Sequence, residues 1–315
     1  MNCKQSRQLE KTEQFIKSQF SNNTKIMRNI CTNHLIVQPN TEIYQVPIRK
    51  FNSTFELQLV DSFLLSEEIS VFDGEIMDVV YSLGKNGNIF FTSDKVASTF
   101  SGNHNQRVAK NRLDEITRSL DKLSSICIRI DCTAELRARN HDKSNFYIYE
   151  GYLLPLERII KFSRTGKQTI LYHLLETPPL YRYAADVHQI IEVPEIFLQT
   201  QNYYSDTYEA IMIKRYVIKR VLQILNPNNN ISSNRISFLW SDSKGSEPKG
   251  LYGTLGYTPD DSIRWRTKTK KMIVRIVSET LQHLKDLNVI SEYMPYREHG
   301  STNPNQPITG FCIKS

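Results

Sequence analysis

The chain has 315 residues, of which 39% are hydrophobic and 23% are charged. These fractions match ordinary globular proteins and exclude a disordered, collagenous or coiled-coil chain, while the length is sufficient for two domains of ordinary size. The net charge is +7, with 40 Lys and Arg residues against 33 Asp and Glu residues. The positions of the basic residues are therefore more informative than their total.

The cysteines and the apolar segments indicate in which cellular compartment the protein acts and whether it is expected to bind a metal. Five cysteines are present, an odd number, without a CxxC pair or a histidine at zinc-ligand spacing. The N-terminus lacks the apolar segment of a signal peptide, and no 18 consecutive residues are apolar. We therefore expect reduced thiols, no metal site, no membrane association and a cytoplasmic location.

The first part of the chain is poor in apolar residues. Residues 1–42 are rich in Asn, Gln, Ser and Lys and predict a polar N-terminal arm with one loosely held helix around Phe15 and Phe20. Residues 43–51 predict a short strand near a sheet edge, because Pro47 has no N–H to donate. We expect the first folded domain to extend over residues 43–154.

Three helices are predicted early in this domain. Residues 72–83 and 107–123 carry apolar side chains at helical spacing, and residues 92–100 form a shorter helix that Thr92 or Ser93 can cap. The segment NIFF, between the first two helices, predicts a brief strand. Two strand segments follow, ICIRIDC and NFYIYEGYLL, joined by a charged loop.

This order of elements is that of a winged helix, a helix-turn-helix variant with an added β-hairpin. The order recurs after residue 200, with a helix over 208–225, a strand, a short helix, a long helix and a final strand pair. We therefore predict an α+β fold with two tandem winged-helix domains, residues 43–154 and 200–315. Residues 155–199 would connect the two domains and contribute partly to the first sheet.

The long helix of the second domain carries a run of basic residues, SIRWRTKTKKMIVRIV. Thr258 and Pro259 predict its N-terminus. At about 100° per residue, one side of the helix is an apolar stripe that includes Ile273 and Leu281. The opposite side is a ridge of cations at spacings of four, three and four, formed by Arg264, Lys268, Lys271 and Arg275.

A basic ridge on the last helix before a hairpin is where a recognition helix enters the major groove of DNA. The alternative is a solvated helix face that is basic by chance. Like charges at helical spacing repel one another, however, and DNA phosphates would supply the counter-charge. We therefore favour DNA binding.

The third helix of the first domain has a weaker version of the same pattern. The side opposite its apolar stripe carries Arg107, Asn111, Asp114 and Arg118, with Lys110 and Lys122 beside them. Arg and Asn are suited to the edges of guanine and adenine, but the acidic residues dilute the charge, so a solvated face stays an equal alternative. Arg137, Arg139 and Lys143 of the charged loop are candidate contacts to the DNA backbone.

No catalytic constellation is apparent. The seven histidines are scattered, and SRTGKQT lacks the first glycine and the Ser or Thr of a phosphate loop. His104 and Arg107 form an HxxR, but they precede a candidate recognition helix rather than a nucleophilic tyrosine. We expect neither enzyme activity nor a cofactor.

The chain resembles the iteron-binding plasmid replication initiators, the Rep proteins built from two winged helices. The resemblance rests on FDGEIMDVVYSL, FFTSDKVASTF, RVAKNRLDEITRSLDKLSSICIRI, YEAIMIKRYVIKRV and the helix that contains RWRTKTKKMIVRIV. It implies sequence-specific binding to repeated double-stranded DNA sites at an origin, opening of an AT-rich segment and recruitment of host replication proteins. It also implies a homodimer in which the first winged helix takes part.

Two other classes of protein remain as alternatives. A winged-helix transcriptional repressor needs the same recognition helices but usually has one unit per chain in a dimer, which favours a palindromic site. A recombinase or nickase needs catalytic residues that the sequence does not display. Two tandem units in one chain suit a long asymmetric repeat, so we expect a plasmid or mobile-element replication initiator.

Overall fold

The structure of the protein is a computed structural model. It describes residues 34–38, 54–59 and 69–314, except for 105–107, 134–135, 138–145, 167, 187–189, 200–206, 227–233, 239–249, 256–262 and 298–300. The fold is mixed helix and sheet, which confirms the predicted α+β class. The predicted N-terminal helix and the predicted strand over 43–51 lie outside the described residues.

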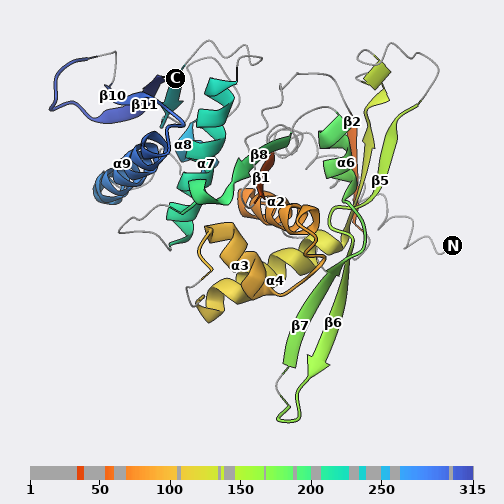
Figure 1. The fold of residues 1–315 in the computed structure, drawn as a ribbon. Coiled ribbons are helices and arrows are strands. Elements are labelled where there is room, and N and C mark those ends of the chain that lie inside the picture. The colour runs from red at the N-terminus through yellow and green to blue at the C-terminus, as the bar shows by residue number, and fades with distance from the viewer. Residues whose placement is uncertain are drawn as a thin grey trace, which may run out of the picture.

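Three helices form the centre of the first half of the molecule (Figure 1), at the predicted places: α2 (Val71–Lys85), α3 (Ser93–Ser101) and α4 (Lys110–Ser124). Ser70 and Thr92 cap α2 and α3, and Gly102 ends α3 in the left-handed conformation that glycine adopts without strain. Periodic apolar side chains from all three helices lie in one buried core.

A two-residue strand, β3 (Phe90–Phe91), separates α2 from α3. It pairs antiparallel with β7 (Gln168–Leu174), and β7 pairs antiparallel with β6 (Leu156–Phe162). The sheet order is therefore β3-β7-β6. The hairpin that shares a sheet with β3 is β6–β7, although the two strand segments predicted after α4 do pair antiparallel, as β4 (Ile126–Asp131) and β5 (Ile148–Tyr152).

Those two segments form a different sheet. β4 (Ile126–Asp131) pairs with β5 (Ile148–Tyr152) on one side and with β2 (Thr54–Leu59) on the other. The helix α6 (Pro179–Asp186) contacts β4 and β5. The β-carbon of any other residue at Gly151 would lie 3.0 Å from the Pro179 side chain, so this close approach requires glycine.

The second half repeats the order of elements (Figure 1), as α7 (Tyr208–Leu225), β9 (Arg235–Ser237), α8 (Leu251–Thr254), α9 (Ile263–Asp286), β10 (Glu292–Arg297) and β11 (Ile308–Lys314). β11 lies between β9 and β10. The sheets β3-β7-β6 and β9-β11-β10 thus each place their last strand between the first and the second.

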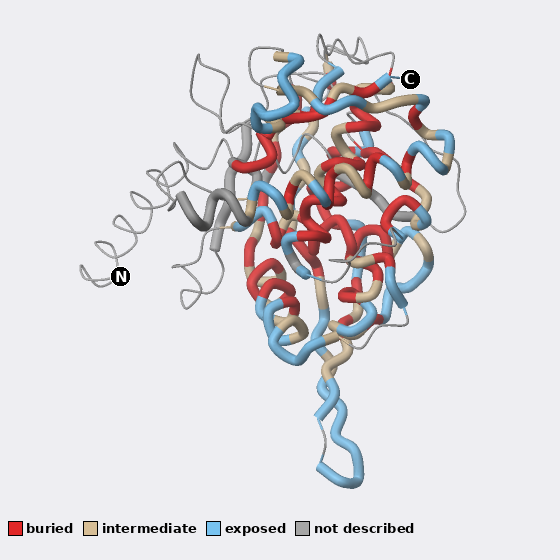
Figure 2. Tube along the Cα trace, turned by 90° about the vertical axis from the view of Figure 1, so that its left-hand side faces the viewer, coloured by how far each residue is buried: buried red, intermediate tan, exposed pale blue. Residues whose placement is uncertain are grey.

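The buried apolar side chains form two clusters, the first core centred on α2, α3 and α4 and the second core centred on α7 and α9. Figure 2 shows the buried segments along the body of the molecule. The first core also includes side chains from β7 and α6, such as Tyr172 and Tyr181, and it extends to Ile211 and Met212 of α7. After α6, the chain passes through β8 (Ile190–Pro194) and the short 3-10 helix η2 (Glu195–Phe197). The strand β1 (His34–Gln38) pairs parallel with β8, so part of the expected polar arm is a strand.

Candidate nucleic-acid interface

The helix α9 has an apolar side and a basic side, as predicted. Ile273, Ile276, Val277, Leu281 and Leu284 are fully buried in the second core. Lys270, Lys271 and Arg275 are exposed. The positions of Arg264 and Lys268 lie within the helix, but their side chains lie outside the described residues, as does the predicted N-terminal cap at Thr258.

Arg275 has a counter-charge that was not predicted from the sequence. Its Nε lies 2.8 Å from Oε1 of Glu279, one turn further along α9. Such an i,i+4 pair on a helix surface stabilises the helix only slightly. Lys271 extends the basic side toward the N-terminus of the helix, and exposed Lys270 lies beside it, nearer the apolar stripe.

The helix α4 presents a mixed surface. Lys110, Asn111 and Arg118 are exposed, and so are Asp114 and Glu115. The Asn111 side chain accepts a hydrogen bond from the backbone N–H of Arg112 at 2.9 Å. Arg107 lies outside the described residues. The exposed face therefore carries the predicted cations together with the acids that dilute them.

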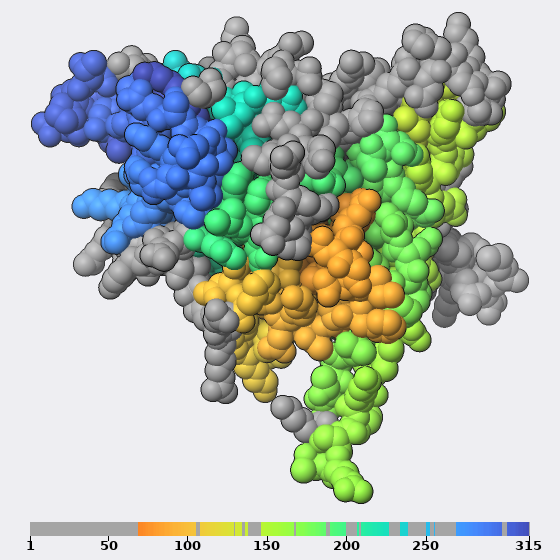
Figure 3. Space-filling view, viewed as in Figure 1, coloured from red at the N-terminus to blue at the C-terminus, as the bar shows by residue number. Residues whose placement is uncertain are grey.

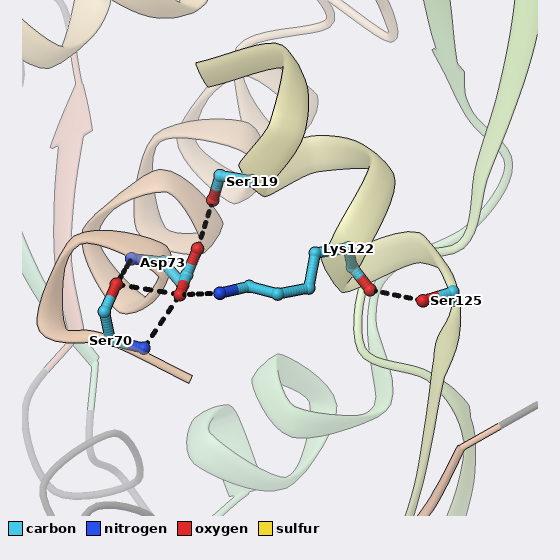
Figure 4. A network of polar contacts seen from close by, with 5 residues as sticks. All are labelled: Ser70, Asp73, Ser119, Lys122 and Ser125. Atoms are coloured by element: carbon cyan, nitrogen blue, oxygen red, sulfur yellow. Dashed lines mark hydrogen bonds and ion pairs between the residues drawn. The ribbon is translucent and has the colours of Figure 1, made fainter. Parts of the chain in front are cut away.

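Lys122 does not belong to this exposed face, contrary to the prediction from sequence. Its side chain is buried, and Nζ lies 2.6 Å from Oδ2 of Asp73 on α2. The other oxygen of Asp73 accepts a hydrogen bond from Ser119 at 2.6 Å. Figure 4 shows that one carboxylate thereby holds two successive turns of α4.

The same carboxylate also caps α2. The Ser70 backbone N–H and hydroxyl both donate to Oδ2 of Asp73, at 2.7 and 2.8 Å, and the Asp73 backbone N–H donates back to the Ser70 hydroxyl (Figure 4). This reciprocal arrangement is a capping box. Because Asp73 is fixed by its own helix, it fixes the position of α4 against α2.

A second carboxylate, Asp121 at the C-terminal end of α4, anchors the hairpin β6–β7. The Tyr172 hydroxyl donates to Oδ1 of Asp121 at 2.9 Å, and Nη1 of Arg158 lies 3.5 Å from Oδ2. Burial, with the charge of Asp121, raises the pKa of the Tyr172 phenol above its ordinary value. The phenol therefore stays a hydrogen-bond donor, and the base of the hairpin is fixed to α4.

Beyond this anchor the hairpin projects from the body of the molecule (Figures 1 and 3), and its outer residues are exposed (Figure 2). Its turn contains the SRTGKQT segment: the Gly166 N–H donates to the Ser163 carbonyl at 3.0 Å, and Gly166 has φ of 75°. The segment is thus a hairpin turn rather than a strand-to-helix phosphate loop.

This hairpin, to which no function was assigned from the sequence, carries the exposed cations Lys161 and Arg164. One local signal could have predicted it: a Thr-Gly turn that directly follows a short segment rich in the β-forming residues Ile159, Ile160 and Phe162. Of the loop residues predicted instead, Arg139 and Lys143 lie outside the described residues. Arg137 is half-buried, with its guanidinium 4.6 Å from the centre of the Phe146 ring.

The second hairpin, β10–β11, is held closer to its own unit. Tyr293 stacks edge-on against buried Phe311, and its hydroxyl donates to Oε1 of Gln282 on α9 at 3.1 Å. Nη1 of Arg297 donates to the Gln306 carbonyl across the loop at 2.5 Å. The described part of that loop, residues 301–307, is mostly exposed.

The two halves meet through buried charges. Glu75 on α2 is ion-paired with the fully buried Arg215 on α7, and Lys219 Nζ lies 3.5 Å from the same carboxylate. The Arg215 guanidinium also lies 5.5 Å from the centre of the Phe100 ring. His104, the histidine of the HxxR, is paired with Glu195 of η2, whose Phe197 belongs to the second core.

Within the part of the chain that the structure describes, no three His, Cys, Asp or Glu side chains gather as metal ligands would. Among the described helices, none combines the length and hydrophobicity required to cross a bilayer.

Comparisons with known proteins do not identify a family. No family model matches the chain, and no curated protein matches it. Among solved structures, the chain is similar to domains 2 and 3 of RctB, with 10% identity, a TM-score of 0.36, and coverage of 90% of this chain and 95% of that chain. A TM-score this low carries no argument, so the function has to be argued from the geometry.

Proposed function

We propose that the protein binds double-stranded DNA through two tandem winged-helix units. The repeated strand order supports this: in β3-β7-β6 and in β9-β11-β10, the first strand lies between a helix and two further helices along the chain, and the other two strands form a later hairpin, as in a winged helix. In the first half, β4 and β5 come between the last of these helices and the hairpin. The first unit of this proposal includes the hairpin β6–β7 and extends to about residue 190, beyond the boundary at residue 154 expected from the sequence. The second extends from residue 207 to the end of β11.

In this arrangement α4 and α9 are the recognition helices, and each precedes its hairpin. The observation that carries the proposal is the basic side of α9, where Lys271 and Arg275 are exposed opposite a fully buried apolar stripe, while exposed Lys270 lies at the flank of that stripe. On α4 the corresponding side carries Lys110, Asn111 and Arg118. The sequence places Arg264, Lys268 and Arg107 on or next to the same helices, and we include them in the interface.

Replication initiation is the function that this arrangement supports best. Two recognition helices in one chain can contact successive major grooves, so one copy of the chain can cover a long asymmetric site. A directly repeated origin site needs such a protein, whereas a repressor with one unit per chain suits a palindrome. We therefore propose a cytoplasmic, non-enzymatic initiator of plasmid or mobile-element replication that acts on repeated sites, with homodimers and host replication proteins as its partners.

Footprinting on the DNA that flanks the gene tests this function directly. We expect protection of several direct repeats, each about two helical turns long, beside an AT-rich tract. A plasmid that carries this DNA and the gene should replicate. Protection of one palindrome over a promoter, without replication of the plasmid, would favour the repressor.

A further inference from the structure

The hairpin β6–β7 carries an apolar stripe on one face. Opposite residues of an antiparallel pair lie on the same face, and side chains alternate along each strand. The register pairs Phe162 with Gln168, Ile160 with Ile170, and Arg158 with Tyr172. These residues therefore share the face whose base, Arg158 and Tyr172, contacts Asp121 of α4.

The stripe is exposed where it extends past α4. The exposed fraction is 72% for Phe162 and 44% for Ile160. Among the described residues, Phe162 is one of the two most exposed large apolar side chains, the other being Phe146 at 76%. The tight turn from Ser163 to Gly166 follows at once, so Phe162 lies in the last pair of a hydrogen-bonded hairpin.

Charge indicates what the stripe contacts. Residues 156–168 contain four cations, Arg158, Lys161, Arg164 and Lys167, and one acid, Glu157. Lysine is depleted in protein–protein interfaces, whereas Lys and Arg next to an apolar side chain are typical of proteins that bind the minor groove of DNA. The composition therefore favours a polyanion, and duplex DNA in particular, over a protein partner.

The dimensions of the groove limit how the hairpin can enter. The minor groove of B-form DNA is about 6 Å wide, and two paired strands lie about 4.8 Å apart before their side chains are counted. A whole β-ribbon does not fit, but one side chain from the end of the ribbon does. Phe162 is at that end, on the side of the hairpin that faces α4.

We propose that Phe162 is a wedge that inserts between two base pairs from the minor groove, while Lys161 and Arg164 contact the flanking phosphates. Apolar wedges of this kind unstack one base step and bend the duplex toward the major groove. The bend would bring DNA toward the exposed face of α4. This inference rests on the proposed function, because it requires duplex binding.

The test uses the full-length chain and a duplex of about 40 base pairs, about four helical turns, from the DNA that flanks the gene. Fluorophores at the two ends report bending, and 2-aminopurine at successive positions reports unstacking. Phe162→Ala removes the wedge, Phe162→Leu keeps an apolar wedge, and Phe146→Ala is the control because it removes an equally exposed phenylalanine elsewhere.

We expect the wild type, Phe162→Leu and Phe146→Ala to brighten 2-aminopurine at one step and to bend the duplex. Phe162→Ala should lose the brightening and at least about 20° of bend, the lower end for inserted side chains, while it still binds. A Phe162→Ala protein that binds and bends DNA like the wild type would overturn the wedge and leave the proposed function intact. Failure of the wild type to bind any duplex would overturn both.

Discussion

Both halves of the molecule contain a helix, a strand, two helices and a hairpin with the same strand order, although the first half has the additional strands β4 and β5 before its hairpin. They distribute charge and polar contacts differently. In the first half, α4 is fixed to α2 by a buried carboxylate, and the cations extend along a projecting hairpin. In the second half, α9 packs through a fully buried apolar stripe, with hydrogen bonds through Gln282 and His283, and the exposed cations lie on the helix itself.

This difference suggests a division of labour within the proposed DNA complex. A long basic helix can supply many phosphate contacts along one groove, whereas a mixed helix beside a hairpin can position the DNA and deform it. If the proposal holds, the same strand order would serve two ways of binding a duplex, because the exposed side chains rather than the fold determine the contacts.

The largest expected effect concerns the way in which α4 is held. Asp73→Ala removes the capping box of α2 and leaves buried Lys122 without its counter-charge. Removal of one partner of a buried ion pair costs about 3–5 kcal/mol. We expect the free energy of unfolding, measured by urea denaturation, to fall by this amount.

The control for this variant is Asp94→Ala, which also removes an acid from the first turn of a helix but from an exposed position. It should cost less than about 1 kcal/mol. If both variants lost the same stability, the buried carboxylate would not be what fixes α4. A Lys122→Met change in the Asp73→Ala protein should recover part of the loss, because it removes the unpaired buried charge.

The second prediction compares the exposed faces of α9 and α4. Replacement of Lys270 and Lys271 by alanine should reduce the slope of log affinity for duplex DNA against log salt by about 0.9 for each phosphate that the variant no longer neutralises. Arg118→Ala on α4 should reduce this slope by no more than about 0.9, the contribution of one phosphate contact. Arg275→Ala should have a smaller effect than either lysine, since Glu279 already neutralises it.

The control is Lys285→Ala, which removes an exposed cation from the C-terminal end of α9. Its salt dependence should match the wild type in a titration followed by fluorescence anisotropy. If Lys285→Ala and the double variant changed the slope equally, general charge rather than the N-terminal part of α9 would account for binding, and the solvated-face alternative would stand.

The comparison also shows which features follow from sequence. Helices α2, α3, α4 and α7 and the buried side of α9 could be predicted, because their apolar side chains recur at helical spacing within a few residues. The pairing of β3 with β7 could not, since it joins residues about 80 positions apart and β4 and β5 offered an equally good local hairpin.

The same limit applies to single side chains. Lys122 lies beside the exposed face on a helical wheel, but its partner Asp73 is 49 positions away and only the folded chain brings the two together. The pair of Arg275 with Glu279 was accessible from the sequence, because it is separated by one helical turn. Local spacing thus predicts helix faces and i,i+4 pairs, whereas burial of a charge depends on tertiary contacts.

The smallest expected effect is a loss of stability at alkaline pH, which falls mainly on the first half. Burial raises the pKa of four tyrosines packed in or against the first core, Tyr81, Tyr149, Tyr172 and Tyr181, and of Tyr216 on α7 in the second half. Such a tyrosine stays protonated in the folded protein. It ionises, and so releases its proton, when the chain unfolds at high pH. The tyrosines therefore do not lower the free energy of unfolding below about pH 10, the ordinary pKa of tyrosine. As pH rises through and above this value, the free energy of unfolding falls.

A Tyr172→Phe variant isolates the phenol that anchors the hairpin. At neutral pH the lost hydrogen bond to Asp121 should cost about 0.5–1.5 kcal/mol. Between pH 8 and pH 10.5 the wild type should lose about 0.8 kcal/mol through this one phenol, and the variant should lack that share of the alkaline decline. Urea denaturation at the two pH values measures both quantities. An equal decline in the two proteins would mean that Tyr172 ionises as readily in the fold as in the unfolded chain, and that its bond to Asp121 does not hold the hairpin against α4.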